Sequence, residues 1–283
     1  MNTLISAADL QSRLREADAP VVLDCSFNLS DTDAGEKAWR EGHIPGAQYL
    51  HLDRDMAGPK EDAQGRFLGR HPLPDRTALA ARLGVLGITS ATSVVCYDAQ
   101  GGMYAARAWW LLRWMGHADV AVLDGGIDAW RAAGGRLTTD APAPRAAAPY
   151  PLLPPALPTI DADALQARLG RVQLIDARGG DRFRGEVEPL DRAAGHIPGA
   201  RNRPFKDNLE ADGRFKSAAA LNAEWTPLLA GGSAADLVQQ CGSGVTACHN
   251  LLALAHAGLG DSVLYAGSWS EWSADPARPQ AKG

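Results

Sequence analysis

The stretch "ADLVQQCGSGVTACHNLLALAHAG" (235–258) joins a short apolar run to a longer segment through a turn containing two glycines and a serine. The run before the turn is typical of a short strand, and the segment after it is typical of a helix. Cys241 stands at the mouth of this turn. In open α/β sheets the ligand site lies beyond the carboxyl ends of the strands, so this position favours chemistry.

The same alternation of strand and helix runs along the whole chain. Short apolar runs predict strands at 21–24, 93–97, 120–123, 173–176, 235–240 and 262–265. Helix-like segments lie at 75–84, 103–115, 217–230 and 245–258. Continuous apolar strands that alternate with helices predict an α/β fold, in which each parallel sheet carries helices on both faces.

Four segments recur in the same order at a nearly constant offset. They are "ISAADLQSRL" (5–14) with "IDADALQARL" (160–169), "VVLDCS" (21–26) with "QLIDAR" (173–178), "EGHIPGA" (41–47) with "AGHIPGA" (194–200), and "LDGGIDAW" (123–130) with "YAGSWSEW" (265–272). Such a series indicates the tandem duplication of one domain. We expect a first copy over 1–137 and a second over 160–283, joined by a proline-rich, extended linker over 138–159.

The composition excludes several classes of partner. The formal charge is −5 and the sequence contains no run of lysine or arginine residues, so nucleic acid is not expected as a partner. No apolar stretch approaches the roughly 18 residues needed to cross a bilayer, so no membrane partner is expected either. The start, "MNTLISAADLQSRL" (1–14), predicts an amphipathic helix capped by Ser6 and not a secretory signal.

The four cysteines are too few and too scattered for a disulfide framework in a chain of 283 residues. None forms a C-x-x-C pair, so no metal site is expected, and a reducing, cytoplasmic compartment fits best. Cys25, Cys96 and Cys248 lie in or beside apolar segments, which favours a packing role.

Cys241 differs from the other three cysteines. Gly242 and Gly244 allow backbone conformations that are closed to other residues, and the following helix begins near Val245. The unpaired N–H groups and the positive dipole end of that helix would stabilise a thiolate. The alternative is a small buried residue at a strand end, but the flanking glycines and the helix start favour the reactive thiolate.

With these features the chain resembles the two-domain rhodanese-type sulfurtransferases. Both "GHIPGA" segments and the closing "GSWSEW" (267–272) carry the resemblance, and the loop "CGSGVTA" (241–247) is similar to that of the mercaptopyruvate sulfurtransferases. The resemblance implies that Cys241 takes a sulfur atom from a donor and carries it as a persulfide, without a cofactor. The loop positions that would surround this sulfur are Gly242, Gly244, Val245 and Thr246.

The first copy carries Asp98 where the second carries Cys241, when the two are aligned on their strands. An aspartate can cap a helix but cannot hold a sulfane sulfur, so the first copy is expected to be non-catalytic. His43 and His196 occur in both copies, which indicates a structural role.

The donor, 3-mercaptopyruvate or thiosulfate, is a small anion and needs local positive charge. The family's carboxylate-binding arginine falls on Arg182 in "GDRFRG" (180–185), and Arg192 is the candidate for a second. Each could instead be a solvated surface residue or the partner of a nearby carboxylate. Arg184 is a weaker candidate.

Three more residues match family positions that assist the reaction. The Ser243 hydroxyl can donate to a keto oxygen or relay a proton, although serine also favours turns. Asp53 and His71 fall on an aspartate and a histidine that form a relay with the cysteine and the serine, and the alternative for His71 is an exposed loop residue.

The sequence therefore predicts a sulfurtransferase that uses 3-mercaptopyruvate and passes the sulfur to cyanide or to a thiol, such as thioredoxin or a low-molecular-weight thiol. A thiosulfate sulfurtransferase is the main alternative, and a rhodanese-like binding module without turnover is a second. A cysteine phosphatase is excluded, because its loop needs an arginine six positions after the cysteine and Ala247 stands there.

Overall fold

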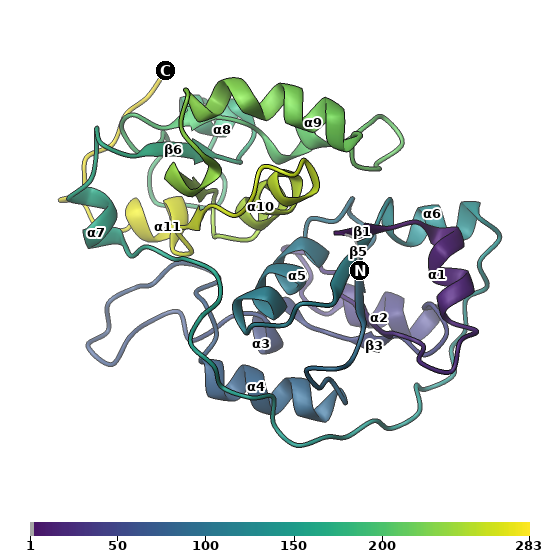
Figure 1. Ribbon diagram of the computed structural model, residues 1–283. Helices are drawn as coiled ribbons and strands as arrows, with labels where there is room; N and C mark the ends of the chain where they lie inside the picture. The colour runs from purple at the N-terminus through teal and green to yellow at the C-terminus, as the bar shows by residue number, and fades with distance from the viewer. Residues whose placement is uncertain (1–2) are drawn as a thin grey trace. The chain divides into compact units, whose positions relative to one another are not determined.

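The structure is a computed structural model that describes residues 3–283 (Figure 1). The chain folds into two compact units. Unit 1 contains the residues up to Ala57, Pro74–Ala156 and Ala211–Phe215, and unit 2 contains Gly58–Leu73, Leu157–Glu210 and Lys216–Gly283. Unit 2 thus includes the segment 58–73, which the repeat pattern alone assigns to the first copy.

Unit 1 is built on a parallel sheet with the strand order β1-β5-β4-β2-β3. The strands are β1 (Leu4–Ile5), β2 (Val21–Asp24), β3 (Gln48–Tyr49), β4 (Val94–Tyr97) and β5 (Val120–Leu123). The helices are α1 (Ala7–Arg13), α2 (Ala34–Glu41), α3 (Leu52–Asp55), α4 (Arg76–Val85), α5 (Ala105–Trp114) and α6 (Gly126–Ala132). As the sequence predicts, Ser6 caps α1 and accepts from the Asp9 N–H at 3.1 Å.

The sheet of unit 1 is buried on both faces. Side chains alternate between the faces of a strand, so Val95 and Tyr97 of β4 point the same way. They join a core cluster with Leu10 of α1 and Ile127 and Trp130 of α6. On the other face α5 packs against β4 and β5. This two-sided burial explains why the strands read as continuous apolar runs.

Unit 2 repeats the architecture on a parallel sheet with the order β7-β6-β8-β9. The strands are β6 (Gln173–Asp176), β7 (Arg201–Asn202), β8 (Leu237–Gln240) and β9 (Val263–Leu264). The α-helices are α7 (Ala162–Gln166), α8 (Gly180–Arg184), α9 (Ala218–Trp225), α10 (Thr246–His256) and α11 (Ser268–Trp272), with short 3₁₀ turns η1 (Phe205–Asn208), η2 (Thr226–Leu229) and η3 (Ala234–Asp236). Leu174 and Val238 of the sheet pack with α7 and α11 on one face, while α10 packs against β8.

Several expected elements are shorter in the structure than in the sequence pattern, and for two of them a local cause is visible. The helix expected over 217–230 ends at Trp225 and continues as the 3₁₀ turn η2, because Pro227 cannot donate an N–H to the helix. The strand expected over 235–240 begins only at Leu237, since η3 precedes it, and Ser233 and Asp236 form a capping box around that turn. Residues 138–159 contain no helix or strand, and their role as an extended linker stays a prediction.

The loop after β4 in unit 1 closes around a carboxylate. Asp98, which is fully buried, accepts hydrogen bonds from the backbone N–H groups of Gln100 (2.8 Å), Gly102 (2.9 Å), Tyr104 (2.7 Å) and Ala105 (2.9 Å). These N–H groups precede or open α5, so they have no partner within the helix. The first copy thus carries its own anion at the position where the second copy carries Cys241.

We expect Asp98→Ala to destabilise unit 1 by at least about 3 kcal/mol, because it leaves four backbone donors without their charged acceptor. Asp98→Asn keeps one acceptor oxygen and should lose less. Thermal or urea unfolding of the full-length protein measures both, with Asp128→Ala on an exposed aspartate as the control. An Asp98→Ala protein as stable as the control would contradict this account of the loop.

Candidate active site

Cys241 directly follows β8 and is buried, with 2% of its surface exposed. Its backbone N–H donates to Ser268 Oγ at 3.1 Å, and its carbonyl oxygen accepts from the Trp269 N–H at 3.0 Å. Helix α10 begins five residues later, at Thr246. The cysteine is therefore held between the end of a central strand and the start of a helix, as the strand–turn–helix pattern predicts.

Gly244 closes the loop that follows the cysteine. Its φ of 74° lies in the left-handed region, and a Cβ at this position would come within 2.3 Å of the Ala266 carbonyl oxygen. Both the backbone angle and the lack of space require glycine. The loop backbone can approach the segment before α11 this closely only because residue 244 has no side chain.

Ser268 holds Cys241 at the cost of an unusual backbone conformation. Its φ is 56°, although it is not a glycine, and its hydroxyl donates to the Tyr265 carbonyl oxygen at 2.9 Å while accepting from Cys241. The corresponding residue of the first copy is Gly126, with a φ of 57°. Sequence reasoning missed Ser268, but the replacement of "GG" (125–126) by "GS" (267–268) in the aligned repeats was a usable signal.

The loop offers several backbone donors beside the cysteine. Among the described residues, no hydrogen bond uses the N–H of Gly242, Ser243, Val245 or Thr246. N–H groups at the start of a helix have no intrahelical acceptor, and together they form a site for an anion. In unit 1 the equivalent donors bind the Asp98 carboxylate. In unit 2 the residue at that position is Cys241.

His71 and Ser243 are brought together from distant parts of the chain. His71 Nδ1 and Ser243 Oγ lie 2.8 Å apart, and both side chains are buried. The histidine belongs to the segment 58–73 of unit 2, and the serine to the loop after β8. Asp53 lies in α3 of unit 1 and is partly exposed, with its Oδ1 atom buried. Its part in the chemistry stays a prediction.

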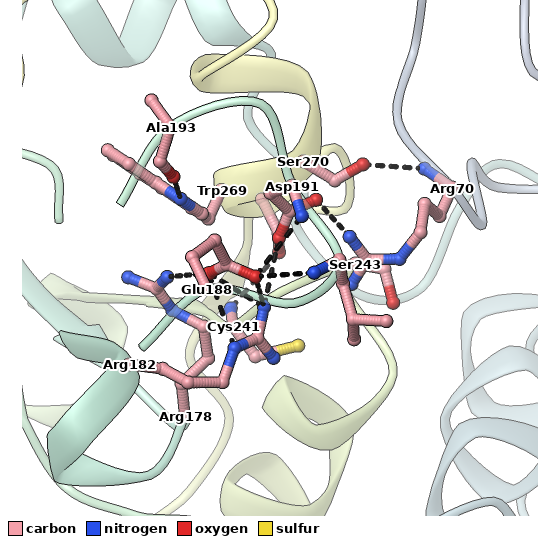
Figure 2. A network of polar contacts seen from close by, with 12 residues as sticks. Arg70, Arg178, Arg182, Glu188, Asp191, Ala193, Cys241, Ser243, Trp269 and Ser270 are labelled. Carbon is pink, nitrogen blue, oxygen red and sulfur yellow. Dashed lines mark hydrogen bonds and ion pairs between the residues drawn. The ribbon is translucent and has the colours of Figure 1, made fainter. Parts of the chain in front are cut away.

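Arg182 takes part in a buried network of charges (Figure 2). Its guanidinium donates to Glu188 at 2.7 and 3.0 Å and to Asp191 at 3.0 Å. Asp191 also accepts from Arg70, through its other oxygen. The side chains of the two acids are only 4% and 3% exposed. The sequence predictions included Glu188 only as a possible salt-bridge partner of an arginine, and they did not include Arg70 or Asp191. The contact between Arg70 and Asp191 joins segments far apart in the chain.

The other arginines of this region have different surroundings. Arg178 is buried, donates to Asp176 at 2.7 Å and lies over the Trp269 ring at 5.0 Å, so its role is structural. Arg184 forms an exposed pair with Glu186. Arg192 is exposed and lines a cavity of about 470 Å³.

The remaining cysteines are fully buried. Burial, and to a lesser degree the neighbouring Cys96, raises the pKa of Cys25 well above its usual value, so its thiol stays protonated. Cys248 donates to the Gly244 carbonyl oxygen at 3.3 Å. His43 and His196 each place Nδ1 near a backbone carbonyl oxygen, at 2.7 and 2.8 Å, as structural histidines do. Within residues 3–283, no helix is both long and apolar enough for a membrane span, and no cluster of potential metal ligands occurs.

The family model of the rhodanese-like domain matches residues 6–133 and 161–275. The chain belongs to the rhodanese-like family. The two matched segments confirm the tandem duplication and the predicted fold of two rhodanese-like domains, each with a parallel sheet between helices.

Relatives of this rhodanese-like chain share nearly its whole length. It is 49% identical over 283 residues to a Pseudomonas aeruginosa protein named "Probable 3-mercaptopyruvate sulfurtransferase", covering 99% of this chain and 98% of that one. It is 41% identical over 284 residues to a Mycobacterium tuberculosis protein named "Putative thiosulfate sulfurtransferase SseB", covering 99% and 97%. The solved structure of the 3-mercaptopyruvate sulfurtransferase from Leishmania major superposes with a TM-score of 0.84 at 30% identity, covering 96% of this chain and 74% of that one.

We expect Gly244→Ala to reduce any reaction at Cys241 at least tenfold, because the new Cβ forces the rhodanese-like loop away from the Ala266 carbonyl. Gly258→Ala is the matched control, since Gly258 also has a positive φ (72°) but open space around its Cβ position. Sulfur-transfer rates and the rate of Cys241 alkylation measure the effect. Equal losses in the two variants would show that backbone strain alone, and not the close approach, matters.

Proposed function

We propose that this protein is a sulfurtransferase that moves a sulfur atom from 3-mercaptopyruvate to a thiol or cyanide acceptor through a persulfide on Cys241. The observation that carries the proposal is the pair of equivalent loops. In unit 1 the loop donors bind the Asp98 carboxylate, whereas the donors of the unit 2 loop remain available beside Cys241. A persulfide is an anion that such donors can stabilise.

The first half-reaction follows from this arrangement. The Cys241 thiolate attacks the sulfur of 3-mercaptopyruvate, and a sulfur–sulfur bond forms while the carbon–sulfur bond breaks. The electron pair of the broken bond stays on carbon as the enolate of pyruvate. The proton that the donor thiol carried is delivered to that carbon, so the products are pyruvate and the Cys241 persulfide anion. Backbone donors of the loop stabilise this anion.

The second half-reaction returns the enzyme to its starting state. An acceptor thiol binds the outer sulfur of the persulfide, the sulfur–sulfur bond breaks, and the Cys241 thiolate is restored. The acceptor, whether thioredoxin, a low-molecular-weight thiol or cyanide, and the cytoplasmic compartment stay predictions from the sequence. All four cysteines are free thiols in the structure, which agrees with a reducing compartment.

His71 and Ser243 can manage the proton of the first half-reaction. Ser243 lies two residues after Cys241 in the loop, and His71 Nδ1 is 2.8 Å from its hydroxyl oxygen. Ser243 can give its proton to the keto oxygen or the carbon of the leaving enolate, and His71 can replace it with the proton that the donor thiol releases, so one proton in all passes from sulfur to pyruvate. Thiosulfate needs no such proton, because sulfite leaves without one.

Thiosulfate is the second candidate donor, and the names of the relatives include both activities. The His71–Ser243 hydrogen bond favours 3-mercaptopyruvate, since only that donor uses a proton. The loop over 241–247 also offers hydroxyl groups and no charged side chain that would favour a dianion.

We expect Cys241→Ser to abolish sulfur transfer and keep the fold, because a hydroxyl of similar volume is a far weaker nucleophile. Cys248→Ser is the matched control, because Cys248 lies in α10, the helix that follows the loop of Cys241. This variant should keep activity. Mass spectrometry of the wild-type protein after 3-mercaptopyruvate treatment should show one added sulfur on Cys241. A wild-type protein that never acquires this sulfur, or acquires it on Cys248, would refute the proposed mechanism.

We expect Ser243→Ala to lower kcat/KM for 3-mercaptopyruvate roughly two- to tenfold, the effect of one lost hydrogen bond, and to leave thiosulfate nearly unchanged. The measurement is the ratio of the two efficiencies in one preparation, which cancels differences in active fraction. An unchanged ratio in a protein that still forms the persulfide would remove Ser243 from proton transfer.

A further inference from the structure

Ser270 of α11 holds two different segments, one through its backbone and one through its side chain. Its backbone N–H donates to the Gly242 carbonyl oxygen at 2.9 Å. Its hydroxyl oxygen accepts from the Arg70 N–H at 2.9 Å, a contact that Figure 2 draws. Gly242 follows Cys241 in the loop, and Arg70 belongs to the segment 58–73. One buried serine therefore joins the loop of the cysteine to a segment from a distant part of the chain.

The two segments that Ser270 joins each supply one partner of the hydrogen bond that manages the proton in the proposed reaction. His71 directly follows Arg70, and Ser243 directly follows Gly242. His71 Nδ1 and Ser243 Oγ lie 2.8 Å apart. Each contact of Ser270 thus lies one residue away from one partner of this pair. The serine sets the spacing of the two backbones on which the pair depends.

A close backbone approach holds the segment on the other side of Arg70. Gly69 has a φ of 105°, and a Cβ there would come within 2.9 Å of the Gly267 carbonyl oxygen. Both the backbone angle and the lack of space require glycine. The segment therefore meets the start of α11 at two consecutive residues, Gly69 and Arg70. Two such contacts fix both the position and the direction of the chain where it reaches His71.

The first copy of the domain has a different residue at the position of Ser270. In the aligned repeats its counterpart is Asp128, whose side chain is 78% exposed and pairs with Arg131 of the same helix at 3.3 Å. Ser270 is only 3% exposed, and its hydroxyl accepts from outside its own helix. The two copies thus differ here in both burial and partner. The buried hydroxyl stands in the copy that carries Cys241.

We propose that Ser270 is a positioning residue for the proton step of the reaction at Cys241. Its two hydrogen bonds hold the segment 58–73 and the loop in the register at which His71 reaches Ser243. The proposal rests on the proposed function, because only the reaction with 3-mercaptopyruvate uses that proton. Ser270 acts through His71 and leaves the chemistry of the step unchanged, since one proton still passes from the donor thiol to pyruvate.

Removal of the Ser270 hydroxyl affects the segment more than the loop. In Ser270→Ala the backbone N–H still donates to Gly242, but the Arg70 N–H loses its acceptor. A donor left without an acceptor is costly, so the segment moves until water reaches that N–H. A movement of about 0.5 Å takes a 2.8 Å contact between His71 and Ser243 out of its favourable range. The loop itself keeps its contacts to α11.

The test compares two sulfur donors in the full-length protein, with cyanide as the acceptor. Ser270→Ala should lower kcat/KM for 3-mercaptopyruvate about two- to tenfold, the effect of one hydrogen bond, and should change that for thiosulfate less than about twofold. Thiosulfate is the internal control, because sulfite leaves without a proton. Ser270→Thr keeps the hydroxyl and should recover most of the loss.

Ser273→Ala is the matched control variant. Ser273 directly follows α11, is 4% exposed, and its hydroxyl has no hydrogen-bond partner among the described residues. This variant should leave the ratio of the two efficiencies unchanged. Gly69→Ala displaces the same segment from Gly267 and should reproduce the donor-selective loss. It therefore tests the positioning of the segment independently if Ser270→Ala fails to fold.

A double-mutant cycle with His71→Ala separates positioning from a general structural role. If Ser270 acts through His71, then Ser270→Ala should lower the efficiency with 3-mercaptopyruvate less than about twofold further once His71→Ala is present. The rate of Cys241 alkylation should stay at the wild-type value in Ser270→Ala, because the loop is intact.

An equal fall for both donors, or losses that multiply in the protein carrying Ser270→Ala and His71→Ala, would overturn the role of Ser270. A loss confined to 3-mercaptopyruvate that disappears without His71 supports it. These outcomes are separate from a failure of the proposed function, in which the wild-type protein would form no persulfide from 3-mercaptopyruvate.

Discussion

Backbone N–H groups at the start of a helix need an acceptor, and this requirement governs both copies of the duplicated domain. In unit 1 the acceptor is the chain's own Asp98, which binds four of these groups and is fully buried. In unit 2 the strand ends at Cys241, and the loop donors stay available. One replacement at one position therefore separates a closed structural loop from a loop that can stabilise a bound anion.

The rest of unit 2 keeps that loop in place. Gly244 allows the backbone to lie against Ala266, and Ser268 accepts from the Cys241 N–H while adopting a left-handed conformation that its counterpart Gly126 adopts without strain. Strained non-glycine residues persist where the surrounding structure over-determines them, and they concentrate at functional sites. The strain at Ser268 lies directly beside Cys241, the proposed nucleophile.

The charges next to the loop are nearly all paired. Burying a guanidinium or a carboxylate alone is costly, and each acid of the network is paired with at least one arginine. The exception among the described residues is Arg70 Nε, which is buried without a hydrogen-bond partner. A network balanced in this way holds Arg70 and Arg182 in fixed positions beside the loop of Cys241.

The sequence alone determined the fold class and the duplication, and it pointed to Cys241 as the candidate nucleophile. Parallel strands buried on both faces are apolar throughout, so they can be recognised from composition. The duplication is visible because the repeated segments keep similar residues in the same order. The glycines around Cys241 are required by the local backbone geometry of the loop. The contact of Arg70 with Asp191 and that of Ser268 with Cys241 depended on tertiary structure, as did the approach of His71 to Ser243. Contacts between residues 70 and 191, or 71 and 243, are set by how the segment 58–73 packs against the rest of unit 2. Local propensity and periodicity do not determine where such a segment packs.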